Sequence, residues 1–151
     1  MTVLISPWAR PLRNGQINPK NYPFWPELVS LIDHPVEQVG VTGETQLVPK
    51  MHIDLDLSSL AELIKGCTTW ISVDSFFQHY CWHLNKPGIV LWGQSDPTIF
   101  GHSSNLNLLK NASYLRQHQF FLWEQAEYRT DCWVEPPAVA AALNHLLGSN
   151  K

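Results

Sequence analysis

Charged residues are scarce in this sequence, and long apolar runs are absent. Only 15% of the 151 residues are charged, and 13 acidic against 10 basic side chains give a formal net charge of -3. This balance provides no general attraction for nucleic acid, so binding to DNA or RNA is not expected. No stretch approaches the roughly 18 consecutive apolar residues that cross a bilayer, so no transmembrane segment is predicted.

Cysteine is also rare, and its spacing shows no metal or disulfide pattern. Cys67, Cys81 and Cys132 form no C-x-x-C pair, which argues against a disulfide framework and against a zinc ribbon. The first residues lack the basic region of a signal peptide, and Pro7 interrupts their apolar run. We therefore expect reduced thiols in a cytoplasmic protein.

Three familiar motifs are missing. The absence of G-x-G-x-x-G and of G-x-x-x-x-G-K-[ST] argues against NAD-type and P-loop chemistry, and the absence of G-x-S-x-G argues against a serine hydrolase. His79 and His83 have a spacing compatible with zinc on a helix, but no H-E-x-x-H pattern accompanies them. We interpret both as structural or solvent-facing histidines, and we predict neither a metal nor a cofactor.

The sequence does contain an alternation of strand and helix patterns. Its length and its 44% hydrophobic residues are enough for a real core, so residues 1–151 are predicted to form one domain. Strands are predicted at 3–5, 36–42, 52–55, 69–73, 89–92 and 105–110, helices at 23–33, 59–66, 76–84 and 136–147, and a loop at 93–102. This order predicts an α/β fold, a Rossmann-like three-layer α/β/α arrangement with a parallel sheet.

Several residues predict where the helices begin and end. Ser59 and Glu62 have the spacing of a capping box, which places a helix start at Ser59. Asp74 or Ser75 is predicted to cap the helix that follows the fourth strand. Gly148 is predicted to close the last helix.

A ligand site is predicted from the strand order alone. In an open parallel sheet of order 3-2-1-4-5, ligands bind beyond the carboxyl ends of the first and fourth strands. The loop after the first strand carries Arg10, Arg13 and Lys20, and the fourth strand is followed by Asp74-Ser75. Backbone N–H groups at a helix start attract anions, so a diphosphate is predicted between this start and the basic loop.

Simpler interpretations of these residues remain open. Asp74-Ser75 is equally consistent with a plain helix cap. The basic side chains, taken alone, are more typical of a solvated loop. Glu44, which follows a strand and a glycine, is either an acceptor for ribose hydroxyls or a surface turn residue, and alone it favours the turn.

Read together, the motifs resemble a known family. The run from Leu60 to Gly101 contains a helix, a strand, Asp-Ser-x-x-x-His, a second helix, Lys-Pro, a strand and Gly-Gln-Ser-Asp-Pro. Further matches, in order along the chain, are Ile5-Ser6-Pro7, Lys20-Asn21-Tyr22-Pro23, Gly43-Glu44, and Asp131-Cys132-Trp133 with Pro137 and Val139. This pattern resembles the carboxyl-terminal half of the family 9 glycosyltransferases, the ADP-heptose:lipopolysaccharide heptosyltransferases, over nearly the whole chain.

The resemblance implies a GT-B fold, in which two Rossmann-like domains face each other across a cleft and the carboxyl-terminal one binds the nucleotide-sugar donor, here of ADP type. It implies that Ser6 and Lys20 contact the donor phosphates. It also implies that Glu44 holds the ribose and that Leu55 lies beside the nucleobase. Arg10, from the basic loop, completes this side of the predicted site.

On the other side, the resemblance implies that Asp74 and Ser75 meet the diphosphate and sugar. His79 would support their loop, and Asp96 would help to shape the site. One position departs from the family pattern, because the glycine after Asp-Ser is Phe76 here. A bulky side chain at this position predicts a rearranged donor loop.

Two functions are consistent with these features. The first is an inverting glycosyltransferase that binds a nucleotide-diphosphate sugar. Because 151 residues leave no room for the family's acceptor-binding domain, a partner chain or a second copy would supply the acceptor site and the base. The second is a non-catalytic module that binds a nucleotide, a nucleotide sugar or a protein. For such an interface the candidate residues are Trp8, Trp25, Trp92 and Trp123.

Overall fold

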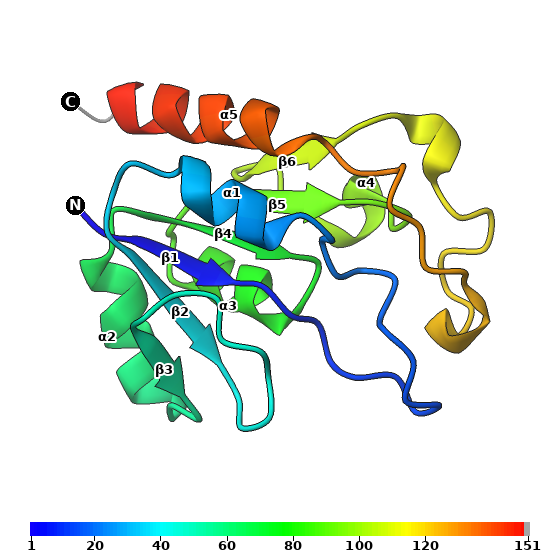
Figure 1. Ribbon diagram of the computed structural model, residues 1–151, viewed down its shortest axis with the longest axis horizontal. Coiled ribbons are helices and arrows are strands. Elements are labelled where there is room, and N and C mark those ends of the chain that lie inside the picture. Colours follow the sequence, from blue (N-terminus) through cyan, green and yellow to red (C-terminus); the bar gives the residue numbers. More distant parts are fainter. Residues whose placement is uncertain (150–151) are drawn as a thin grey trace.

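The computed structural model describes residues 1–149 and has a six-stranded parallel sheet in the order β3-β2-β1-β4-β5-β6 (Figure 1). The strands are β1 (Val3–Ser6), β2 (Val36–Gly40), β3 (Met51–Ile53), β4 (Thr69–Val73), β5 (Ile89–Trp92) and β6 (Leu106–Leu109). The helices are α1 (Trp25–Leu31), α2 (Leu57–Gly66), α3 (Phe76–His83), α4 (Pro97–Phe100) and α5 (Pro136–Ser149), with 3-10 turns η1 (Ala112–Tyr114) and η2 (Trp123–Gln125). The predicted α/β fold and its 3-2-1-4-5 strand order are confirmed, with β6 added at the β5 edge.

The two faces of the sheet bury separate apolar clusters, which makes the fold three-layered. Alternate residues of a strand point to opposite faces. Val3 and Ile5 of β1 therefore join the cluster beneath α1 and α5, whereas Leu4 joins the cluster that packs on α2 and α3. In Figure 1, α1 and α5 lie together on one side of the sheet, and α2 and α3 lie on the other.

The amino ends of the central strands are closed by tight packing. Trp70 of β4 donates its indole N–H to the carbonyl of Lys86 at 2.9 Å. Gly88, just before β5, lies so close to this indole that an added Cβ would be 2.3 Å from two ring carbons. The Gly88 N–H donates to Asn105 Oδ1 at 3.2 Å. A glycine is therefore required here by close approach rather than by an unusual backbone angle.

Two predicted helix ends are wrong. α2 begins at Leu57 rather than at Ser59, because Asp56 is the N-cap and accepts the Ser59 N–H at 2.7 Å. Asp and Ser are comparable caps, and the structure uses the earlier one. α5 continues through Gly148, which lacks the positive φ of a helix-terminating glycine.

Other local predictions also need correction. Residues 93–102 are not wholly a loop, because α4 forms within them after the Asp96 cap. Ser75 occupies the N-cap position of α3, but neither it nor Asp74 makes a side-chain capping bond. Trp25 and Trp92 are fully buried, so they are core residues and not interface candidates.

Cys67, Cys81 and Cys132 are buried free thiols. Burial raises the pKa of each thiol above its ordinary value, which makes them poor nucleophiles near neutral pH. Among residues 1–149, no helix has both the length and the apolar character that crossing a membrane requires.

Candidate functional site

A cavity of about 560 Å³ lies where the carboxyl ends of β1, β2 and β4 meet the start of α3. This volume is within the usual range of about 300–1,000 Å³ for small-molecule sites. Seven of the nine residues predicted from the sequence line it: Ser6, Arg10, Lys20, Glu44, Leu55, Asp74 and Ser75. They come from segments far apart in the chain and meet because parallel strands end at the same edge.

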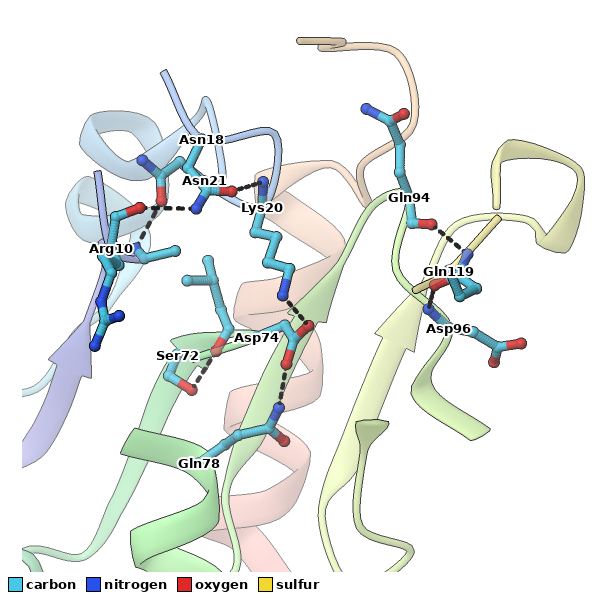
Figure 2. A network of polar contacts seen from close by, with 12 residues as sticks. Arg10, Asn18, Lys20, Asn21, Ser72, Asp74, Gln78, Gln94, Asp96 and Gln119 are labelled. Carbon is cyan, nitrogen blue, oxygen red and sulfur yellow. Dashed lines mark hydrogen bonds and ion pairs between the residues drawn. The ribbon is translucent and has the colours of Figure 1, made fainter. Parts of the chain in front are cut away.

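Lys20 and Asp74 form an ion pair at the centre of this site. Lys20 Nζ lies 3.0 Å from Asp74 Oδ2, and Asp74 is only 5% exposed. The other carboxylate oxygen, Oδ1, accepts a hydrogen bond from Gln78 Nε2 at 2.8 Å (Figure 2). Lys20 Nζ also lies 4.9 Å from the centre of the Trp123 ring. The lysine therefore presents a fixed positive charge beside the start of α3.

The loop that carries Lys20 is ordered by two asparagines, which sequence reasoning missed. Asn18 Nδ2 donates to the carbonyl of Arg10 at 2.8 Å, and its Oδ1 accepts the Lys20 N–H at 3.0 Å (Figure 2). Asn21 Oδ1 accepts the Ala9 N–H at 2.8 Å. Asparagine commonly bonds to nearby backbone in turns, and this tendency was the available signal.

Tyr22 anchors the far end of the same loop. Its ring packs edge-on against Trp25 and Trp133, and its hydroxyl donates to the carbonyl of Val134 at 2.7 Å. Burial raises the pKa of Tyr22. The position of Lys20, two residues away, is thus tied to the segment just before α5.

The start of α3 offers donors and an unpartnered hydroxyl to the cavity. Because Ser75 makes no capping bond, no side chain satisfies the N–H groups of the first turn. Ser75 Oγ and Gln78 Oε1 are buried and have no hydrogen-bond partner among residues 1–149. Buried polar atoms of this kind call for an explanation, and a bound polar ligand is one. With Lys20 alongside, the arrangement suits an anion.

Glu44 is held at the opposite side of the cavity. Its Oε1 accepts the Val41 N–H at 2.8 Å. A Cβ on Gly40 would lie 2.6 Å from this oxygen, so the glycine makes room for the carboxylate at the end of β2. Desolvation by burial raises the pKa of Glu44, with a smaller contribution from the negative charge of Asp54.

An apolar wall completes the cavity and includes residues that were not predicted to bind. Leu55 lines it together with Leu57 and Phe76, and Asp54 lies at the adjoining turn. Asp54 has a positive φ of 55° and accepts the Thr42 N–H at 3.0 Å, which closes the turn between β2 and β3. The cavity thus has one polar side and one apolar side.

The structure does not bring His79 and Asp96 to the cavity. His79 does not line it, and its Nδ1 lies 2.7 Å from His102 Nε2. Asp96 caps α4 by accepting the Thr98 N–H at 2.8 Å. Among residues 1–149, no three His, Cys, Asp or Glu side chains gather in a metal-binding arrangement.

A second hollow, of about 420 Å³, adjoins the first. The two share Arg10, Pro11, Asn18 and Lys20. Its outer wall is the segment Phe120-Phe121-Leu122, in which Phe120 is 81% exposed. We call this segment the aromatic rim. Lys20 therefore lines both the first cavity, at the strand ends, and the second hollow, beside the aromatic rim.

The fold of this chain is similar to that of solved glycosyltransferase structures. The chain is similar in fold to Escherichia coli ADP-heptose lipopolysaccharide heptosyltransferase II, with a TM-score of 0.66 and 20% identity over 99% of this chain and 47% of that one. It is also similar to E. coli heptosyltransferase WaaC with ADP, with a TM-score of 0.65 and 16% identity over 96% of this chain and 44% of that one. The chain thus spans less than half the length of each solved structure. No curated protein matches it in sequence.

Residues 31–127 match the sequence model of glycosyltransferase family 9 (heptosyltransferase). The matched range covers more than half of the chain and includes β2 to η2. The predicted family resemblance is therefore confirmed. This chain belongs to glycosyltransferase family 9.

Proposed function

We propose that this chain binds a nucleotide-diphosphate sugar at the carboxyl end of its sheet and acts as the donor-binding half of a glycosyltransferase. The observation that carries this proposal is the cavity in which seven predicted donor-site residues meet around the Lys20–Asp74 pair. Its polar side suits a diphosphate, and its apolar side suits a nucleoside. The similar WaaC structure contains ADP, which supports an adenine nucleotide as the first ligand to test.

The residues would act on the donor through charge. When the sugar is transferred, the bond between its anomeric carbon and the diphosphate oxygen breaks, and the diphosphate leaves with the electron pair. Lys20, Arg10 and the first N–H groups of α3 would stabilise this growing negative charge. Glu44 would hold the ribose through its hydroxyls.

The acceptor hydroxyl must lose a proton to a base, and each carboxylate or histidine that lines the donor cavity within residues 1–149 already has a partner. Asp74 is paired with Lys20 and Gln78, and Glu44 lies at the end of β2, on the ribose side. The other two candidate bases that line the cavity are also engaged, His52 with Glu37 and Asp54 with Thr42. We therefore assign the acceptor site and its base to polypeptide outside these 151 residues, in a partner chain or in a second copy.

Calorimetric titration with ADP, UDP, GDP and CDP tests the donor site. Lys20→Ala is expected to weaken binding of the preferred nucleotide roughly tenfold to a hundredfold, the usual value of a charged hydrogen bond. Lys65→Ala, at an exposed lysine of α2 outside the cavity, is the matched control and should bind as the wild type does. Binding of no nucleotide by the folded wild-type chain would refute the proposal.

The aromatic rim favours a second candidate, a non-catalytic nucleotide-binding module that docks onto another protein. Phe120, Phe121 and Leu122 are consecutive, exposed and adjacent to the cavity, and exposed apolar patches often mark interfaces. Turnover of a nucleotide sugar that depends on Lys20 would exclude this candidate.

A further inference from the structure

Phe76 is the most exposed aromatic side chain that lines the first cavity. It is the first residue of α3, directly after Asp74 and Ser75, and 62% of it is exposed. Leaving a phenyl ring in water forgoes the free energy of its burial. An exposed ring at the mouth of a ligand cavity therefore suggests a surface that a ligand covers.

The ring is held in place from behind. Tyr80, one helical turn later, stacks on Phe76 with 5.6 Å between ring centres and 18° between planes. The Tyr80 hydroxyl donates to the carbonyl of Leu57 at 2.8 Å, which ties α3 to the start of α2. His83 stacks on Tyr80 in turn, at 6.3 Å and 13°. Tyr80 therefore supports the Phe76 ring, most of which stays exposed.

Phe76 belongs to the apolar side of the cavity. Leu55 and Leu57 line the cavity with it, whereas the charged pair of Lys20 and Asp74 belongs to the polar side. A flat group that covers the Phe76 ring near these leucines would bury apolar surface. Stacking on an aromatic ring suits every nucleobase, since each has a π-face.

We propose that Phe76, backed by Tyr80, is the stacking platform for the base of the bound nucleotide. This inference rests on the proposed function and adds a residue that selects for a planar base over a bare diphosphate. Where the family pattern has a glycine, the Phe76 ring would thus add a contact with the base that a glycine cannot make.

Titrations with ADP, UDP, GDP and CDP, and with inorganic pyrophosphate as a base-free probe, test this inference. Phe76→Ala is expected to weaken the preferred nucleotide about tenfold, the usual scale of base–aromatic stacking, and to leave pyrophosphate binding unchanged. Phe76→Trp should keep nucleotide affinity, because the indole also offers a flat face. Trp82→Ala, on the same helix but outside the cavity, is the matched control.

The opposite interpretation makes the opposite prediction. If the ring merely obstructs the site, Phe76→Gly will bind the nucleotide as tightly as the wild type or more tightly, and the inference is overturned. An equal loss of nucleotide and pyrophosphate affinity in Phe76→Ala would also overturn it. Either result leaves the proposed function intact as long as Lys20→Ala weakens both probes, whereas failure of the wild type to bind any probe removes both.

Discussion

The two ends of the parallel sheet are built differently. At the amino end, Trp70 and Gly88 are in such close contact that no side chain fits between them, and Asn105 Nδ2 is the one buried polar atom there without a partner among residues 1–149. At the carboxyl end, the strands open into a cavity with a buried ion pair and an unpartnered Ser75 hydroxyl. The amino end is therefore tightly packed, whereas the carboxyl end contains a cavity lined by polar groups, one of them unpartnered among residues 1–149.

The largest effect is expected at the carboxyl end, from Lys20→Ala. Asp74 would be left buried without its cation, which should lower the free energy of unfolding by about 3 kcal/mol. Urea denaturation measures this loss. Asp74→Asn in the same chain removes the uncompensated charge and should restore part of the stability. An equal loss with and without Asp74→Asn would show that the ion pair is not the cause.

A smaller loss is expected at the amino end, from Gly88→Ala. The new methyl group would overlap the rigid Trp70 ring, at a cost of about 1–3 kcal/mol typical of overpacking. Urea denaturation again measures stability, and nucleotide affinity should not change. Gly66→Ala is the control, because no atom lies within 4 Å of its added Cβ. Loss of nucleotide binding in folded Gly88→Ala would contradict the separation of the two ends.

Glu44→Gln should have a modest, pH-dependent effect. The pKa of Glu44 is raised in the folded state, so the folded state holds the proton more tightly and its stability falls as pH rises above the unfolded pKa. Removing the charge should raise stability near pH 7 by less than about 1 kcal/mol, since the residue is half-buried and partly solvated. Thermal unfolding at pH 4 and pH 7 checks this, because the gain must shrink at the lower pH.

The smallest effect on stability is expected at the aromatic rim. Phe121 is 57% exposed, so Phe121→Ser should change the free energy of unfolding by no more than about 0.5 kcal/mol. Urea denaturation measures it. A loss above about 1 kcal/mol would mean that this segment is packed as tightly as the amino end, and the contrast between the two ends would weaken.

The central strands were predictable from the sequence because their composition leaves few alternatives. Apart from Ser72, residues 69–73 and 89–92 are apolar, β-branched or aromatic, and every residue in both strands is buried. Helix ends were less predictable, since Asp56 and Ser59 are comparable caps and only the folded chain selects one. α4 escaped prediction because Gly93, a few residues before it, and Pro97, its first residue, are typical of loops.

The place of the cavity was predictable, but the partners of the side chains that line it were not. The rule that ligands bind where strand order reverses correctly located the cavity beside Ser6 and Asp74. A motif gives the position of a residue along the chain and says little about its partners. His79 therefore turned out to contact His102, and Lys20 turned out to be paired with Asp74.

The anchoring of Tyr22 has a consequence for the order of folding. Its hydroxyl reaches Val134, and the Tyr128 hydroxyl reaches the carbonyl of Asn21 at 3.4 Å, across sequence separations of 112 and 107 residues. Contacts between such distant residues form late, because a long loop must close first. The loop that carries Lys20 therefore depends for its final position on the segment before α5, more than 100 residues away.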